Sequence, residues 1–589
     1  MPAMHAVNSP GAEIKVSPGG RTRTLRVAII FGLLGLLLAG CLFGATPAAR
    51  TSRWLGPILL EVLAMFRDPG TQWMVFACCG VYFTTFVLLQ HRESGKRFWR
   101  WNNPDVWLIA ALGLAASRYA LGYGAQTGTE MLVWLGGATL GKCMAWASFK
   151  SRKRKAESRE LKAEDGGRAS ALFRDAATTP EGKLDSDRKM DFSVTQFPVI
   201  VQVLLGLLVV AVFWQNEAGM RFQYREQARW TGPWENPNVF GMLMGVGMVL
   251  ALGRVVSSSC KEPVVRGSRS VVASWLKLSF FLTAAGILGF GLVMSYSRGA
   301  WVGTAAGTVW LAWGRLSREM RGIRDRENQK FKVQSARSAV RARSRDRWGG
   351  RLGGFLGRNA VPLAVLAVSL VVLAFWQFRH TEVTTVRRAF SVGNVNDFSW
   401  RNRVAAWVGA LQMMAERPLT GWGWNQVEPI YDQFYRPSHV YEGMAIQLND
   451  YLTLGVAIGI PALACLLACV GLSLGARGEG RRTKSEGGGP KAENGQGAVR
   501  TENTAPKGRI PEGRNIEHPI LNFEPRTATG QGASSDFGLR TSAFRSACHS
   551  GALVLLVAFW FDGGLFRLAT ATVFWLLLEM GRERCGDES

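Results

Sequence analysis

The sequence predicts an all-α protein, a polytopic transmembrane helix bundle of about 12 spans with one large periplasmic loop that contains short helices. Three observations lead to this class. Of the 589 residues, 48% are hydrophobic although the formal net charge is +27. Apolar runs of about 17–25 residues, long enough to cross a ~30 Å hydrocarbon layer, recur along the chain. Between them, Lys and Arg gather in alternate connecting segments.

The apolar runs are taken in chain order. The expected spans are 25–46, 72–89, 106–122, 130–149, 194–215, 239–255, 272–294, 301–316, 360–378 and 451–474. Two shorter runs, 549–561 and 566–580, close the chain. They form either two spans or one re-entrant hairpin that turns at Asp562, and backbone at that depth must be buried in protein.

The basic clusters set the expected orientation. They lie in 92–100, in 150–162, in 315–332 with 341–347, and in 477–484, whereas the intervening segments are short or sparsely basic. Because Lys and Arg collect in loops that stay in the cytoplasm, both termini are expected there. The loop 379–446 is then periplasmic. The same reasoning accounts for the positive charge through topology and contact with membrane lipid, so no nucleic acid partner is expected.

This orientation divides the chain into eight parts. They are a cytoplasmic N-terminal tail (1–24), the first transmembrane helices (25–149), a basic cytoplasmic linker (150–191), a central transmembrane region (192–378) with a basic cytoplasmic loop (317–358), the periplasmic loop (379–446), a transmembrane helix (447–474), a disordered cytoplasmic insertion (475–546) and a C-terminal transmembrane hairpin (547–581). The insertion is rich in Gly, Glu, Lys and Pro and poor in aromatic residues, which argues against a packed core.

Cysteine and motif usage exclude several classes. The nine Cys show neither a disulfide framework nor zinc spacing, and no glycine-rich phosphate loop occurs. We therefore expect no metal and no cofactor. The tetrapeptide ending at Cys41 resembles a lipoprotein signal, and a first transmembrane helix is the alternative.

Arginines concentrate on the expected outer face. Arg221, Arg225 and Arg229 lie in one outer loop, Arg298 stands in nearly continuous apolar sequence, and Arg401 and Arg403 open an apolar-periodic stretch, 401–418. That stretch carries Val404, Trp407, Val408, Leu411 and Met414 at helical spacing and stops at Pro418. It predicts a helix lying along the membrane surface with one apolar face down. The planar guanidinium group of arginine can donate two hydrogen bonds at once to a phosphate or diphosphate.

A polar triplet, Asn449, Asp450 and Tyr451, stands at the head of the apolar run 451–474. Ten residues before Asn449, His439 lies in the large loop, with Glu442 close to it. His439, Glu442 and Asp450 are candidate proton acceptors.

Three stretches together resemble a known family. They are "SRGAWVGTAAG" (297–307), "RNRVAAW" with "ERPLTGWGWNQ" (within 401–426) and "NDYLTLGVAIGIPAL" (449–463). In this order and spacing, over about 194–474, they resemble the O-antigen ligase / O-antigen polymerase superfamily of bacterial inner-membrane glycan transferases.

The resemblance implies a function. Such proteins take a glycan from undecaprenyl diphosphate and join it to lipid A-core or to a growing glycan, without a metal or a nucleotide sugar. By this match Arg403 and Arg298 are the family arginines, with an expected catalytic role at the diphosphate, and Asn449 is the motif asparagine, expected to bind substrate. Their own positions make His439 and Asp450 candidate catalytic residues. Position likewise makes the following residues candidates for substrate binding: Arg221, Arg225, Arg229, Arg401, Trp407 and Tyr451. Two positions depart from the family pattern, because Leu448 replaces a histidine and Ala457 a glutamate.

Three alternatives to a ligase stay open at this stage. A repeat-unit polymerase shares the donor chemistry and differs only in its acceptor. A transporter for a lipid-linked glycan predicts functional charges within the spans, whereas the expected spans are nearly free of charge. A non-catalytic family member serving as a scaffold would explain Leu448 and Ala457.

Overall fold

The protein is described by a computed structural model over part of its length. The described residues are 33, 35–36, 38–40, 42, 80–89, 91–92, 99, 101–120, 133–147, 199–215, 221–224, 227–258, 268–338, 398–424, 426–438, 440, 449–475 and 531–582. Within these ranges the chain is predominantly helical.

The labelled helices are α5 (Pro104–Ala120), α7 (Val199–Phe213), α8 (Pro237–Ser258), α9 (Ser268–Met294), α10 (Arg298–Ser338), α13 (Phe398–Glu416), α14 (Val427–Ile430), α15 (Asp450–Ile458), α16 (Ile460–Gly475), α17 (Gln531–Phe561) and α18 (Leu568–Arg582). A 3-10 turn, η2 (Gly232–Trp234), precedes α8, and a π-helical turn, η4 (Tyr431–Tyr435), follows α14. Strands β1 (Gln223–Tyr224) and β2 (Gln227–Ala228) form a small antiparallel hairpin, pairing Gln223 with Ala228.

Three of the described helices are long and apolar enough to cross a membrane. The apolar segments are Pro237–Val256 of α8, Trp275–Met294 of α9 and Ala543–Phe561 of α17. Shorter apolar helices cover Gly80–Leu89, Pro104–Ser117, Val199–Phe213 and Ile460–Gly475. The expected helical class with candidate membrane helices is therefore confirmed, and the count of about 12 spans stays a prediction.

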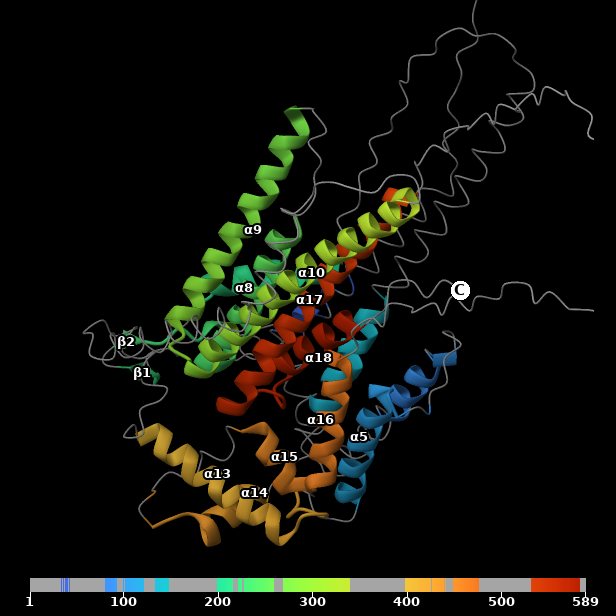
Figure 1. The fold of residues 1–589 in the computed structure, drawn as a ribbon. Coiled ribbons are helices and arrows are strands. Elements are labelled where there is room, and N and C mark those ends of the chain that lie inside the picture. Colours follow the sequence, from blue (N-terminus) through green and yellow to red (C-terminus); the bar gives the residue numbers. More distant parts are fainter. Residues whose placement is uncertain are drawn as a thin grey trace, which may run out of the picture.

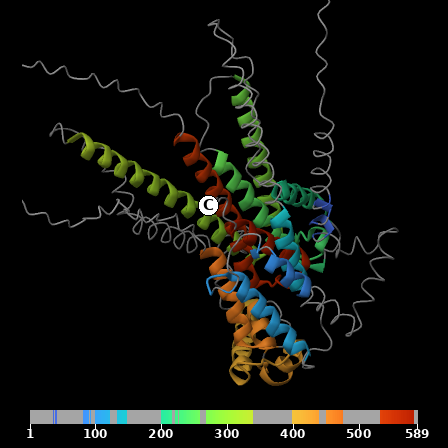
Figure 2. The same cartoon turned by 90° about the vertical axis from the view of Figure 1, so that its right-hand side faces the viewer.

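The long helices lie on one side of the molecule and the short ones gather at one end. In Figure 1, α10 and α17 run beside each other, and both views show α13, α14 and α15 grouped beyond the end of the bundle where α10 begins and α17 ends. We call this the α13 end. Figure 2 shows the far part of α10 projecting from the opposite end of the bundle.

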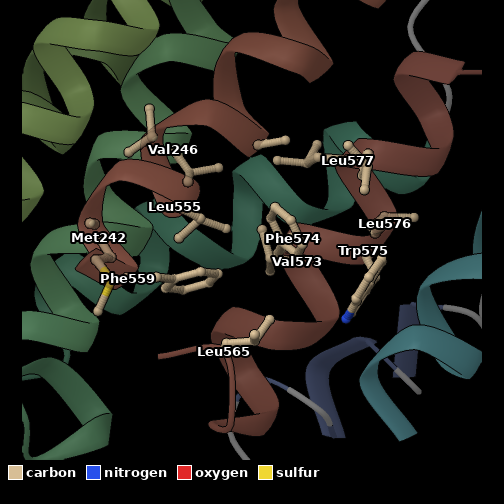
Figure 3. Packing of buried hydrophobic residues seen from close by; sticks show 14 of the residues in the cluster. Met242, Val246, Leu555, Phe559, Leu565, Val573, Phe574, Trp575, Leu576 and Leu577 are labelled. Atoms are coloured by element: carbon tan, nitrogen blue, oxygen red, sulfur yellow. The ribbon is translucent and has the colours of Figure 1, made fainter. Parts of the chain in front are cut away.

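The core forms where α8, α17 and α18 meet. Figure 3 shows Val246 of α8 near Leu555 of α17, with Phe574 of α18 beside them, and all three side chains are buried. Aromatic edges also pack here, since the rings of Phe559 and Phe574 lie 5.5 Å apart in an edge-to-face arrangement.

Small residues allow a close approach between α10 and α17. Gly299, Gly303 and Gly307 recur every fourth residue and therefore share one face of α10. A Cβ on Gly303 would clash with the carbonyl oxygen of Val554, and one on Gly307 would lie 2.7 Å from that of Ser550. The glycine spacing of the 297–307 motif thus brings α17 against the backbone of α10.

Two expected boundaries differ from the structure. The apolar run expected to end at residue 316 continues as α10 to Ser338, because the charged residues that follow are themselves compatible with helix. Helix α17 begins at Gln531, inside the segment expected to be a cytoplasmic insertion.

The span expected over 451–474 is broken into α15 and α16. Gly459 joins them with φ of +102°, a conformation that side-chain-bearing residues rarely adopt, and Pro461 follows two residues later. The freed backbone is satisfied elsewhere, since the amide of Ile460 donates to the carbonyl of Pro418 over 2.8 Å. This break aims the first residues of α15 toward the α13 end.

A buried charge network joins α18 to the earlier helices. Lys142, on a helix covering 133–147, donates to Asp105 at the start of α5 over 2.6 Å and to Glu579 of α18. Arg582 donates to both oxygens of Asp105 over 2.6 and 2.7 Å. His91 lies 3.0 Å from the same carboxylate. Lys142 and Glu579 lie within the expected spans 130–149 and 566–580, whereas the other members of the network lie just outside expected spans. These charges come from distant segments and pair only in the folded bundle.

Candidate active site at the α13 end

The turn before α10 organises the site. Tyr296 has φ of +51°, an unusual value for a residue with a side chain, and it reverses the chain between α9 and α10. The Ser297 hydroxyl accepts from the amide of Ala300 over 3.2 Å and so caps α10. Arg298 is the first residue of α10 and is 7% exposed. The start of this helix therefore places a buried arginine beside a buried hydroxyl.

Arg403 reaches the same place from α13. It is 8% exposed, and its Nη2 donates to Oδ1 of Asp562 over 3.0 Å. Asp562 follows α17, 159 positions along the chain from Arg403. Its other oxygen, Oδ2, accepts from the Ser297 hydroxyl over 2.7 Å. One carboxylate therefore joins α10, α13 and the end of α17.

The turn that carries Asp562 is fixed on both sides. The amide of Leu565 donates to Asp450 Oδ2 over 2.6 Å, and the Thr570 hydroxyl donates to the carbonyl of Gly564. Gly564 itself has φ of +148°. Because α15 and α18 each hold one side of the turn, the Asp562 carboxylate has a defined position. Asp450 was expected to be catalytic, but one of its carboxylate oxygens accepts the hydrogen bond that holds this turn.

Asn449 caps α15. Its Oδ1 accepts from the amides of Tyr451 and Leu452, each over 3.1 Å, which satisfies two donors at the helix start. The residue is 1% exposed, and its Nδ2 has no hydrogen-bond partner among the described residues. The oxygen of the side-chain amide therefore caps α15, whereas its nitrogen is buried without a partner among the described residues.

We expect substitutions of Asn449 to test the capping role of its side-chain oxygen. Asn449→Ala removes the cap and should lower the free energy of unfolding by about 1 kcal/mol. Asn449→Asp keeps an oxygen that can accept from the backbone amides of Tyr451 and Leu452, so its free energy of unfolding should remain close to that of the wild type. Thermal unfolding of the purified variants in detergent measures the difference. Equal losses for both variants would contradict the capping role.

Aromatic rings of α13, α17 and α15 pack in a row, and two of them, Trp400 and Trp407, lie on the same helix as Arg403. The centroids of Trp400 and Trp407 lie 5.6 Å apart, those of Trp407 and Trp560 5.5 Å, and those of Tyr451 and Trp560 6.0 Å. The Tyr451 hydroxyl donates to the carbonyl of Leu556 over 2.6 Å. Tyr451 and Trp407 therefore belong to one aromatic row that connects α13, α15 and α17.

The other predicted site residues have different surroundings. Arg221, beside the small hairpin, and Arg401 on α13 are exposed. Arg229 donates from Nε to the carbonyl of Ser295 over 2.9 Å and from Nη2 to Asn238 over 2.9 Å, so it supports the turn before α10. Arg225 and His439 lie outside the described residues, as do Glu442 and Leu448.

The expected helix over 401–418 is present as α13. Val404, Val408 and Leu411 are exposed along one side, 39%, 51% and 57% respectively. Met414, expected on the same face, is buried because it packs against Gly455 of α15. The exposed apolar stripe is thus narrower than the sequence predicted.

The segment formed by α14 and η4, which packs against Gly409 of α13 through Tyr431 and Tyr435, also carries ionisable groups. Burial, and then the neighbouring Asp432, raise the pKa of the Glu428 carboxyl. Burial and a hydrogen bond with Glu416 raise the pKa of Tyr435 to about 12. The Tyr435 phenol therefore keeps its proton at neutral pH and is a donor there.

Sequence reasoning missed Asp562 and Ser297. Asp562 was read only as part of a turn, and Ser297 only as part of a motif. No periodicity links positions 159 residues apart, as Arg403 and Asp562 are. One signal for Asp562 was present in the sequence: it is an acidic residue between two apolar runs, 549–561 and 566–580, and an acid in such surroundings needs a basic partner.

The fold and the site define a helical protein with candidate membrane helices and a buried arginine–carboxylate pair at one end. Residues 283–467 match the family described as O-antigen ligase, so the chain carries an O-antigen ligase domain and the sequence resemblance is confirmed. The matched segment contains Arg298, Arg403 and Asn449, whereas Asp562 lies beyond it. Comparisons with curated proteins and with solved structures return no match.

Proposed function

We propose that the protein is a bacterial inner-membrane glycosyltransferase of the O-antigen ligase type. It transfers a glycan from undecaprenyl diphosphate to an acceptor, lipid A-core or a growing glycan, at the periplasmic face. The observation that carries the proposal is Arg403, a buried arginine in the O-antigen ligase domain whose acidic partner among the described residues is Asp562. Buried arginine marks a site for anions, because its fork matches phosphate oxygens.

Arg403 and Arg298 have the roles of diphosphate ligands in this proposal. Both are at least nine-tenths buried and come from the starts of α13 and α10. When the bond between the sugar and the diphosphate breaks, negative charge grows on the leaving group. Fixed cations in a water-poor site stabilise that charge more strongly than cations in water do. The reaction then requires neither a metal ion nor a nucleotide sugar.

The remaining site residues act on the two substrates. Asn449, with its Nδ2 available, and Tyr451 and Trp407, in the aromatic row, orient the acceptor or the sugar rings. Asp450 and His439 assist at the acceptor side. Arg221, Arg225 and Arg401 attract the anionic donor from solvent. Arg229 acts indirectly, since it holds the turn before Arg298.

The proposed orientation places the α13 end in the periplasm and both termini in the cytoplasm. The basic segment of α10 beyond residue 315 then lies at the opposite, cytoplasmic end, as expected for clustered Lys and Arg. The exposed side of α13 contacts lipid head groups in this arrangement, because its apolar stripe ends next to Arg401.

The test is glycan analysis in a deletion strain complemented with wild-type or Arg403→Gln protein. We expect Arg403→Gln to reduce transfer at least about 10²-fold, because one preorganised cationic donor is lost. Gel analysis of surface glycan and of carrier-linked glycan measures the effect. Arg417→Gln is the matched control, since Arg417 follows α13 and stacks on the Trp422 ring at 3.9 Å. The strain that carries Arg417→Gln should show the same surface glycan and carrier-linked glycan as the wild type.

The glycan pattern also separates the alternatives. Full-length polymer stranded on its carrier identifies a ligase, whereas single repeat units on the final acceptor identify a polymerase. Unchanged glycan with well-expressed Arg403→Gln protein would refute the proposal and favour the scaffold. The buried charge network does not favour a transporter, because Lys142 and Arg582 pair with Asp105 and Glu579 inside the bundle.

A further inference from the structure

We infer that Asp562 is the general base of the transfer and that donor binding releases it from Arg403. This inference rests on the proposed function. It assigns a catalytic role to a residue outside the matched O-antigen ligase segment, on the turn between α17 and α18.

Asp562 is placed for contact with reacting groups. Its side chain is 3% exposed and contacts Arg403, the residue proposed to hold the diphosphate. It also lies against the first turn of α10, where a Cβ on Gly299 would collide with its Oδ2. Only the absence of a side chain at Gly299 admits the carboxylate so close to the amino end of α10. A carboxylate there is stabilised by the helix dipole and by Arg403.

Arg403 has capacity for a second anion. Its Nη2 donates a hydrogen bond to Asp562, whereas its buried Nε has no hydrogen-bond partner among the described residues. An unsatisfied buried donor is costly, so this face of the guanidinium favours an incoming acceptor oxygen. A diphosphate has several oxygens and more charge than one carboxylate, and Arg forks bind such groups through two donors at once.

The exchange changes what Asp562 can do. Once the diphosphate occupies Arg403, the carboxylate loses its cation and faces a second negative group in a buried site. Like charges at close range favour proton uptake by one of them. The acceptor hydroxyl is the proton source, so a strong base forms only when the donor is bound.

The step balances without a cofactor. The acceptor oxygen attacks the anomeric carbon of the donor sugar and forms the new glycosidic bond, while its proton passes to Asp562. The bond from the anomeric carbon to the diphosphate breaks, and its electron pair leaves with the diphosphate, whose charge Arg403 and Arg298 stabilise. When undecaprenyl diphosphate departs, Asp562 gives the proton to water and pairs with Arg403 again.

The surrounding carboxylates fit this assignment less well. Both Asp562 oxygens accept from side chains, Oδ1 from Arg403 and Oδ2 from Ser297, whereas Asp450 Oδ2 accepts from the backbone amide of Leu565 and so holds the turn that carries Asp562. Asp432 lies on η4 with Arg436 at 3.6 Å, and both side chains are about one-third exposed. Among the described residues, Asp562 is the carboxylate that contacts Arg403.

The experiment compares binding with transfer in the purified full-length protein in nanodiscs. The probe is an undecaprenyl diphosphate-linked glycan with its acceptor. Asp562→Asn keeps the shape and removes the charge. We expect donor affinity equal to or higher than wild type, because the competing carboxylate is gone, and single-turnover transfer at least about 10²-fold slower, because the base is lost. Asp432→Asn, a matched change at the same end, should stay within about twofold of wild type in both assays.

Three outcomes would overturn the inference. Transfer by Asp562→Asn at the wild-type rate would make Asp562 only a counter-ion. Parallel loss of donor affinity and thermal stability would make it only a structural residue. Equal donor affinity and transfer in wild type and Arg403→Gln would instead remove the proposed function itself, so the two failures are distinguishable.

Chemical rescue provides a second, independent measurement. Asp562→Ala leaves space for a small anion beside Arg403. Formate should restore transfer at least about 10-fold, because it can accept the proton, whereas chloride should not. Equal rescue by chloride would show that only negative charge is needed and would contradict a base.

Discussion

Lys142→Met is expected to destabilise the protein by about 3–5 kcal/mol, because it leaves buried acids without their cation. Lys142 is 1% exposed at its side chain and is shared by Asp105 and Glu579. After the substitution, Arg582 must serve as the cation for both carboxylates: it already donates twice to Asp105 and lies 3.2 Å from Glu579, while His91 stays beside Asp105. Heating the detergent-purified protein and measuring the fraction that stays monodisperse would detect the loss.

A double substitution tests the charge explanation. Lys142→Met with Glu579→Met removes one cation and one anion, so the remaining Asp105 and Arg582 stay balanced. Replacing a buried ion pair with apolar side chains costs little in other proteins. The double variant should therefore regain at least about half of the stability that Lys142→Met loses. A double variant as unstable as the sum of the single variants would show that packing, and not charge, holds this region.

Gly303→Leu is the second large effect, and it acts by separating α10 from α17. The new side chain would collide with the carbonyl of Val554 and crowd Ala558. Overpacking of this kind costs about 1–3 kcal/mol or more, since backbone must move. Because Gly299 contacts Asp562 on the same face, we also expect transfer activity to fall, with Arg403 and Asp562 pulled apart.

Gly286→Leu is the matched control for Gly303→Leu. Gly286 lies within α9, is exposed, and has nothing within 4 Å of where its Cβ would be. Leucine favours helix over glycine by about 0.5–1 kcal/mol, so this variant should equal or exceed wild-type stability. Comparable losses for both variants would mean that glycine is needed for flexibility and not for close packing.

The sequence predicted some helices and site positions well and others poorly. The apolar runs of α8 and α9 begin and end within a few residues of the expected bounds, because apolar length and flanking polarity are local properties. The sequence also predicted helix α13, with arginines near its start, and the polar residues at the head of α15, since each depends on a short stretch. Gly459 shows the limit, because a single glycine divides an apolar run that reads as one span.

The sequence by itself determined the class of protein, which is helical with candidate membrane helices and an O-antigen ligase domain. It also indicated that two arginines in apolar surroundings, Arg298 and Arg403, need anionic partners. Only the tertiary structure decided the partners. It paired Arg403 with Asp562, 159 positions away, turned Arg229 toward the carbonyl of Ser295, and joined Lys142 to Glu579, 437 positions away. The physical reason is that periodicity records which face of a helix avoids water, whereas a buried charge finds its counter-charge through the packing of whole helices.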